Sequence, residues 1–214
     1  MKLSIAKQLK KQSQVQIAFL QDEIMEILYS LTDDLIFHGG TAIWRCYNGK
    51  RFSEDLEFYS ISFDEILAEF KKSVESHGLT VQRIKDTGNL ISYSIESNRA
   101  VVKVEINHVS KVTGNQISYE LADGSHMEIL SLIADQFINE KILAYSDRRF
   151  IRDIYDIYYI STNYELLDPT LKSLAEFIAD LEPPVDEQVL KTLVYAGIPP
   201  KFENMVAEIK RHIR

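Results

Sequence analysis

The chain has 214 residues, of which 45% are apolar and 26% charged, a composition typical of a folded globular protein. Its net charge of −8 argues against a surface coated with basic residues for non-specific nucleic-acid binding. Charges interrupt every long apolar stretch, the N-terminus lacks an apolar signal-peptide core, and the single cysteine, Cys46, cannot form an internal disulfide. These features predict a cytoplasmic protein without a membrane segment.

The first part of the chain is predicted to combine helices with short strands. Apolar residues recur at helical spacing up to Leu31, and Gly78 ends a later amphipathic helix. Short apolar runs that end in glycine pairs or polar turns favour strands. One or two helices are predicted within residues 4–31, and further helices at residues 41–47 and 64–77. The predicted strands are residues 35–38, 56–59, 80–84, 90–96, 101–107 and 117–121.

From Met127 onward the pattern favours helices, with apolar stripes that include Leu130, Ile133 and Phe137. Proline pairs at 183–184 and 199–200 separate further helical stretches. The predicted fold class is α+β, with a mixed β-sheet core flanked by helices and a helical C-terminal part. The predicted parts are residues 1–125 and 126–214.

A glycine pair between the first strand and the following helix is a candidate ligand site. In the sequence Phe-His-Gly-Gly-Thr, Gly39 and Gly40 form the turn and Thr41 begins the helix. Glycines let the backbone approach a ligand closely, and the first turn of a helix has unpaired N–H groups that bind phosphate. The same sequence also suits a simple turn.

Two acids alternate with apolar residues on the strand that follows. Asp55 and Glu57 point to one face if residues 55–59 are extended, while Leu56 and Phe58 point to the other. Two neighbouring carboxylates repel each other, and a divalent cation such as Mg²⁺ relieves that repulsion. An exposed edge strand would show the same alternation, so this pattern leaves both interpretations open.

A third acid lies on the strand at 101–107. Val102, Val104 and Ile106 are expected to face the core, so Lys103 and Glu105 face the other side. Glu105 on a neighbouring strand would complete a two-metal site for in-line displacement at a phosphate. Alone, this strand reads as a solvated polar face.

The helical region at 137–159 contains several charged residues. In one continuous helix, Lys141, Arg148 and Arg152 would lie within roughly 40° of one another, with Asp156 about 60° from Lys141. If the helix instead ends near Ser146, packing assembles this stripe. The arginines could also pair with nearby acids on a solvated face, whereas Lys141 interrupts an otherwise apolar helix and favours a functional role.

Two sequence blocks together resemble the AbiEii/AbiGii toxin family of nucleotidyltransferases. The first block, HGGTAIWRCYNGKRFSEDLEFY, is similar to the family's Gly-Gly-Ser/Thr turn and Arg-x-Ser-x-Asp-hydrophobic-Asp strand. The second, INEKILAYSDRRFIRDIYDIYYI, resembles its Glu-Lys helix followed by Arg-Asp-x-x-Asp. Order and approximate spacing agree over roughly residues 35–160.

The resemblance implies a polymerase-beta-like nucleotidyltransferase that depends on Mg²⁺ (or Mn²⁺). It implies transfer of a nucleotide from an NTP to an RNA (tRNA) or protein acceptor, by the toxin of a toxin–antitoxin or phage-defence pair with a cognate antitoxin. The implied metal ligands are Asp55 and Glu57, and Glu105, placed by the strand period, is the third metal candidate. The implied nucleotide-binding residues are Gly39, Gly40, Thr41, Arg51, Ser53 and Lys141, and the late catalytic acid is Asp156, with Asp153 as the alternative.

One position departs from the family pattern. Glu57 stands where the family usually has Asp, and its extra methylene displaces the carboxylate. This leaves open an alternative function as a catalytically degenerate nucleotide- or partner-binding regulatory module. A phosphotransferase, which would move phosphate rather than nucleotide, is a third possibility.

Overall fold

The computed structural model describes residues 3–109 and 111–213, and the chain divides into two compact units. Unit 1 contains the chain up to Asn48 together with Phe52–Leu132, and unit 2 contains Gly49–Arg51 and the chain from Ile133 onward. The division falls after Leu132 rather than after residue 125 because one further strand belongs to the sheet of unit 1.

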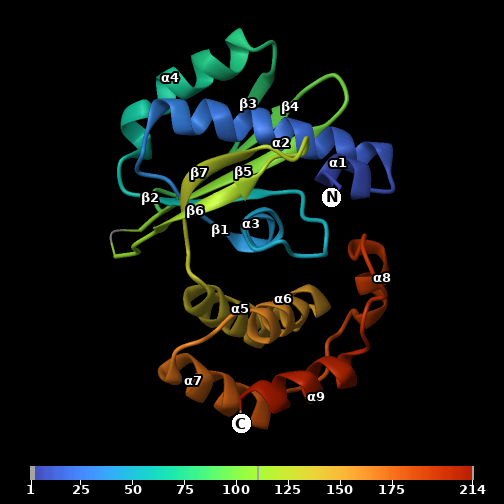
Figure 1. The fold of residues 1–214 in the computed structure, drawn as a ribbon. Helices are drawn as coiled ribbons and strands as arrows, with labels where there is room; N and C mark the ends of the chain where they lie inside the picture. The colour runs from blue at the N-terminus through green and yellow to red at the C-terminus, as the bar shows by residue number, and fades with distance from the viewer. Residues whose placement is uncertain (1–2, 110, 214) are drawn as a thin grey trace. The chain divides into compact units, whose positions relative to one another are not determined.

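Unit 1 is built on a mixed sheet that has seven strands within the described residues (Figure 1). The strand order is β3-β4-β5-β2-β1-β7-β6. β2 pairs in parallel with β5, and β1 with β7, while the other neighbours are antiparallel. The strands are β1 (Ile36–His38), β2 (Leu56–Ser60), β3 (Thr80–Asp86), β4 (Leu90–Glu96), β5 (Val101–His108), β6 (Asn115–Glu120) and β7 (His126–Ser131).

Helices cover the sheet of unit 1, with α2 and α4 on one side and α3 on the other (Figure 1). Phe58 of β2 lies 6.4 Å from Tyr29 of α2, and Tyr93 of β4 lies 6.1 Å from Phe70 of α4, measured between ring centroids. Because side chains alternate along a strand, the neighbours of these residues in β2 and β4 face the opposite side. The helices are α1 (Ile5–Gln8), α2 (Gln12–Leu31), α3 (Gly39–Cys46) and α4 (Phe63–Ser76).

Unit 2 is helical, and α6 packs against both α5 and α9. The segment Gly49–Arg51 belongs to this unit because Tyr195 holds it: the Tyr195 N–H donates to the Lys50 carbonyl, and the hydroxyl to the Gly49 carbonyl. The helices are α5 (Ala134–Arg148), α6 (Ile151–Asn163), α7 (Asp168–Ala179), α8 (Leu190–Leu193) and α9 (Phe202–His212), with a 3₁₀ turn at Glu187–Val189.

The α+β class is confirmed, one local prediction is wrong, and one alternative left open by the sequence is decided. Residues 126–131 form β7 rather than the start of a helix, and α5 begins at Ala134. A short apolar run suits either element, and pairing with β1 and β6 decides for the strand. The region 137–159 is not one helix, because Arg149 adopts a left-handed conformation (φ +51°) that separates α5 from α6.

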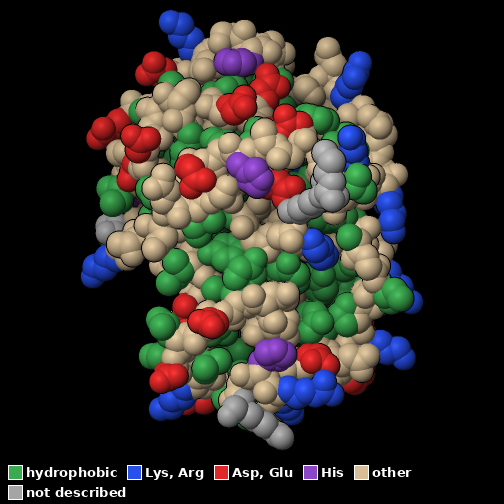
Figure 2. Space-filling model, viewed as in Figure 1, with side chains coloured by type: hydrophobic (Ala, Val, Ile, Leu, Met, Phe, Trp, Pro, Cys, Tyr) green, Lys and Arg blue, Asp and Glu red, His purple; other side chains and the backbone are tan. Residues whose placement is uncertain are grey.

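The surface agrees with the composition. On the face shown in Figure 2, Lys and Arg side chains lie in separate places with acidic side chains between them. Among the helices of the described residues, none combines the length and apolar character needed to cross a membrane.

Candidate active site

Two neighbouring strands bring the three predicted acids to one face of the sheet. Asp55 immediately precedes β2, Glu57 lies within it, and Glu57 is directly opposite Glu105 of β5 in the parallel register. Leu56 and Val104, also opposite each other, are fully buried. The alternation predicted from the sequence therefore places the acids away from the apolar face.

These acids influence one another electrostatically. Burial raises the pKa of the Asp55 carboxyl, and the negative charges of Glu57 and Glu105 raise it further, while Lys103 opposes them. The pKa of Lys103 is raised by its hydrogen bond to Glu105 and by the charges of Asp55 and Glu57. Repulsion between carboxylates is the condition that a bound cation relieves.

Gly39 provides the space for the Glu57 carboxylate. Its φ of +76° is unfavourable for other residues, and a Cβ at this position would overlap the carboxylate. The Glu57 carboxylate thus lies against the residue that begins α3, where the helix dipole favours negative charge. The glycine turn serves the acid site directly, whatever it contributes to phosphate binding.

Two buried polar side chains fix the backbone around Asp55. The Thr41 hydroxyl donates to the Asp55 carbonyl at 2.5 Å. The Gln21 amide of α2 donates to the carbonyls of Ser53 at 3.0 Å and Glu54 at 2.8 Å. Thr41, which the resemblance assigns to phosphate, is 1% exposed and is occupied in positioning Asp55; Gly40, in the same turn, is also buried.

The donor set suits a hard divalent cation, because it consists of carboxylate oxygens from Asp55, Glu57 and Glu105. Yet no group of three or more His, Cys, Asp or Glu side chains within residues 3–109 and 111–213 is already arranged to hold a metal. The Glu105 carboxylate is instead engaged by the Lys103 ammonium at 2.6 Å. The chemistry therefore fits a metal, and Glu105 would have to exchange its partner.

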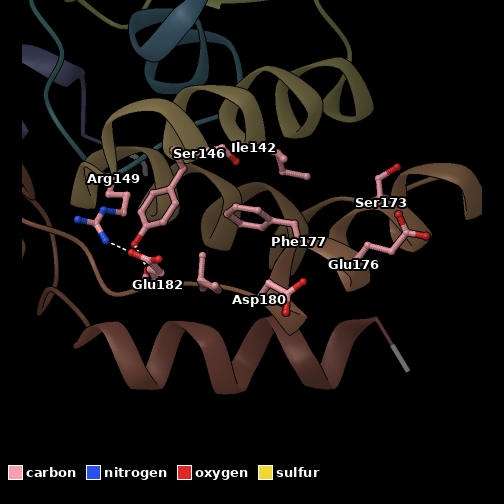
Figure 3. Close-up of a pocket in the computed structure, with 10 residues that line it drawn as sticks. Ile142, Ser146, Arg149, Ser173, Glu176, Phe177, Asp180 and Glu182 are labelled. Atoms are coloured by element: carbon pink, nitrogen blue, oxygen red, sulfur yellow. Dashed lines mark hydrogen bonds and ion pairs between the residues drawn. The ribbon is translucent and has the colours of Figure 1, made fainter.

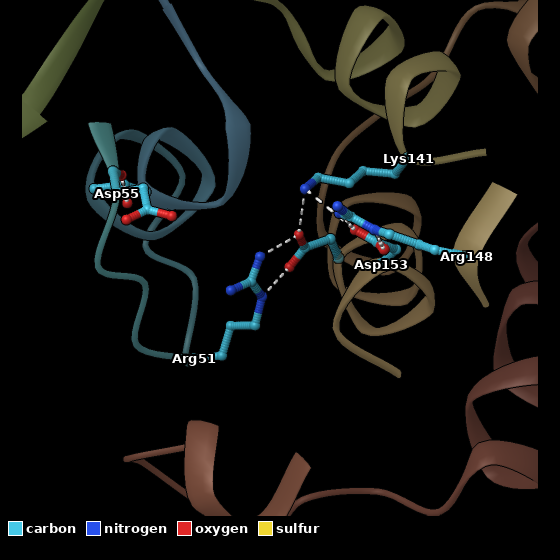
Figure 4. A network of polar contacts seen from close by, with 7 residues as sticks. Arg51, Asp55, Lys141, Arg148 and Asp153 are labelled. Atoms are coloured by element: carbon cyan, nitrogen blue, oxygen red, sulfur yellow. Dashed lines mark hydrogen bonds and ion pairs between the residues drawn. The ribbon is translucent and has the colours of Figure 1, made fainter. Parts of the chain in front are cut away.

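In unit 2, Asp156 lies at the centre of a second charged cluster, whose other members Arg51, Lys141, Arg148 and Asp153 are labelled in Figure 4. Arg51 donates two hydrogen bonds to it, at 2.6 and 2.5 Å, and the Lys141 ammonium lies 3.0 Å from its carboxylate. Lys141 is also 3.6 Å from Asp153, which receives two hydrogen bonds from Arg148. Asp153 and Asp156 are both buried, with exposures of 0% and 1%.

Asp156 is held ionised by this arrangement. Burial alone would raise the pKa of its carboxyl, but the charges and hydrogen bonds of Arg51 and Lys141 outweigh burial and lower the pKa. The sequence motifs identified Arg51, Lys141 and Asp156 as site residues, but they did not predict that these residues pair with one another. Arg148 does pair with a nearby acid, while Arg149 pairs with Glu182 on the surface.

Sequence reasoning did not identify Ser92. This residue of β4 lies directly opposite Glu105, is 1% exposed, and its hydroxyl has no hydrogen-bond partner in the described structure. Buried hydroxyls are normally paired, so this one is a candidate to serve the acid site. The period of two along Leu90–Glu96 places it on that face, but its pairing with Glu105 depends on strand register.

Unit 2 also contains an open pocket of about 600 Å³, between α5 and α7 (Figure 3). Ile142, Tyr145 and Phe177 contribute its apolar lining, and the Arg149–Glu182 ion pair lies at its edge. None of the predicted site residues lines this pocket. We therefore place the candidate active site at the acids of unit 1 rather than here.

Comparison with known proteins identifies the family of the chain. A family model described as nucleotidyl transferase AbiEii toxin, type IV toxin–antitoxin system, matches residues 24–209, whereas a search of curated proteins gave no match. The solved structure of MenT4, a nucleotidyltransferase toxin from Mycobacterium tuberculosis, is similar with a TM-score of 0.65 and 20% identity, over 94% of this chain and 82% of MenT4. JHP933 from Helicobacter pylori has a TM-score of 0.67 and 19% identity, over 96% and 91%. The chain thus belongs to the AbiEii family of nucleotidyltransferase toxins and is a nucleotidyltransferase.

Proposed function

We propose that this protein transfers a nucleotide from an NTP to an RNA (tRNA) or protein acceptor, with Mg²⁺ or Mn²⁺ held by Asp55, Glu57 and Glu105. The observation that carries the proposal is the pair of neighbouring strands that presents these three carboxylates on one face. A bound divalent ion would neutralise phosphate charge and lower the pKa of the attacking hydroxyl.

In the proposed reaction, the acceptor hydroxyl attacks the α-phosphorus while the bond to the bridging oxygen of the β-phosphate breaks. Pyrophosphate leaves, and Glu105 accepts the hydroxyl proton. Thr41 and Gln21 contribute by fixing the backbone that carries Asp55, because phosphoryl-transfer catalysis depends on positioning and charge stabilisation. Phosphate contacts from Gly39, Gly40, Arg51, Ser53 and Lys141, and a catalytic role for Asp156, remain predictions from the resemblance.

The test is incorporation of label from each α-labelled NTP into a cellular RNA or protein extract with Mg²⁺. Wild-type protein should label one class of acceptor, and Asp55→Ala should label none. Glu54→Gln is the matched control, because Glu54 is the exposed neighbouring acid and should not be required. Absence of product from folded wild-type protein would reject the proposal, and label transferred only from the γ position would indicate a phosphotransferase.

A substitution at Glu57 distinguishes an active site adapted to glutamate from a degenerate one. Its carboxylate fits against Gly39, which supports a site adapted to the longer side chain. Glu57→Asp should therefore lower activity. A gain of activity would favour the alternative, a site that has degenerated into a nucleotide- or partner-binding regulatory module.

The proposal extends to the biological role. Expression of the wild-type chain should slow growth, Asp55→Ala should not, and co-expression of a cognate antitoxin should restore growth. Equal toxicity of a folded Asp55→Ala variant would separate toxicity from this site.

A further inference from the structure

Lys103 is a cation at the acid site of unit 1. Its ammonium nitrogen is 2.6 Å from Oε1 of Glu105, and the two side chains are 40% and 24% exposed. Lys103 and Glu105 are two residues apart on β5 and so share a face of the sheet. An ammonium at hydrogen-bond distance from a carboxylate supplies positive charge there, as a bound metal ion would.

Strand register extends this contact to the other acids. Leu56 is opposite Val104, and the residues that precede these two in the chain are Asp55 and Lys103. Glu57, opposite Glu105, completes the group. Lys103 therefore lies near all three acids that are proposed to bind metal, and their charges raise its pKa.

We propose that Lys103 is a resident counter-cation: it neutralises Glu105 in the metal-free protein and must be displaced before Glu105 can bind a divalent ion. This inference rests on the proposed metal site. It explains why three acids gather on one face although no set of three acidic or other ligating side chains among the described residues already has metal-binding geometry. It also predicts that the lysine weakens metal binding in the absence of nucleotide.

The expected size of the effect follows from the exposure of the pair. A partly exposed ion pair contributes on the order of 1 kcal/mol, which corresponds to about fivefold in a binding constant. Lys103→Met removes the competing charge but retains a similar side-chain length. Lys103→Arg keeps the charge and should bind metal about as weakly as the wild type.

The experiment is a titration of the full chain with Mn²⁺ alone, in which free Mn²⁺ is measured by electron paramagnetic resonance. Lys103→Met should bind Mn²⁺ about fivefold more tightly than wild type. Lys72→Met is the matched control, because Lys72 is an exposed residue of α4 and its loss changes the net charge equally. It should leave the affinity unchanged.

Four results would overturn the inference. If Lys103→Met binds Mn²⁺ no more tightly than wild type, or if Lys72→Met tightens binding equally, Lys103 is not a specific competitor. If wild type binds no Mn²⁺, or Asp55→Ala binds it as well as wild type, the proposed metal site itself fails and the inference fails with it. Comparison of Asp55→Ala with Lys103→Met therefore distinguishes the two failures.

Discussion

Asp156 offers a demanding test of how the helical unit is stabilised. Its carboxylate faces two buried cations, Arg51 and Lys141, at distances of 2.5 to 3.0 Å. Asp156→Asn preserves the shape of the side chain but removes its negative charge, so Arg51 and Lys141 both lose their nearest opposite charge. Breaking a buried ion pair on one side costs about 3–5 kcal/mol, because the remaining charge stays desolvated.

The matched control is Glu182→Gln, which also removes a carboxylate from an arginine. The Arg149–Glu182 pair is exposed, with side-chain exposures of 42% and 69%. Its loss should cost less than about 1 kcal/mol. Burial is thus the principal difference between the two substitutions.

Urea unfolding followed by circular dichroism measures both variants. With a denaturant slope of about 2 kcal/mol/M, Asp156→Asn should lower the midpoint by about 1.5–2.5 M. Because the pKa of Asp156 is lowered in the folded protein, its contribution is present above the pKa of an unfolded Asp, about 3.9, and is lost as pH falls through the folded pKa. The difference between wild type and Asp156→Asn should therefore shrink at strongly acidic pH. A midpoint shift no larger than that of Glu182→Gln would refute the reasoning.

Three further predictions concern unit 1. Asp55→Asn should raise the free energy of unfolding at neutral pH by about 0.5–1 kcal/mol, because it removes repulsion from Glu57; a thermal melt that shows destabilisation would contradict this. Gly39→Ala should destabilise by more than about 1 kcal/mol, because φ is +76° and a Cβ would overlap the Glu57 carboxylate; an unchanged urea midpoint would show that the turn relaxes freely. Asp34 accepts hydrogen bonds from Ser60, Ile61 and Ser62 that outweigh burial and lower its pKa. Asp34→Ala should therefore lower the free energy of unfolding by about 1–2 kcal/mol at neutral pH, and by less as pH falls through the folded pKa of Asp34. Parallel thermal melts at pH 7 and pH 3 would measure this difference.

Local periodicity made much of the acid site predictable. The alternation at 55–59 and 101–107 placed Asp55, Glu57 and Glu105 on faces opposite the core, and the strand at Leu90–Glu96 has the predicted bounds. Side-chain period follows from backbone geometry alone, so a sequence reveals it. The identity of neighbouring strands does not follow in the same way, because pairing depends on the whole sheet.

Long-range pairing defeated sequence reasoning elsewhere. Arg51 and Asp156 are 105 positions apart, and no local pattern indicates that they meet. Strand β7 was mistaken for a helix because its apolar run suits both structures until its neighbours are known. Likewise, Lys103 was correctly placed on the face of Glu105, but its contact with the carboxylate required coordinates.

The two charged clusters differ in their net charge. Asp55, Glu57 and Glu105 carry three negative charges against one positive charge on Lys103, so these four side chains sum to −2 when all are ionised. In unit 2, Arg51, Lys141 and Arg148 carry three positive charges against two on Asp153 and Asp156, a sum of +1. Selection for stability alone would not retain unrelieved repulsion between acids, whereas binding a cation requires it. The acids of unit 1 therefore carry an excess of negative charge that a cation would relieve, as the proposed metal site requires, while Asp156 and Asp153 are each paired with cations.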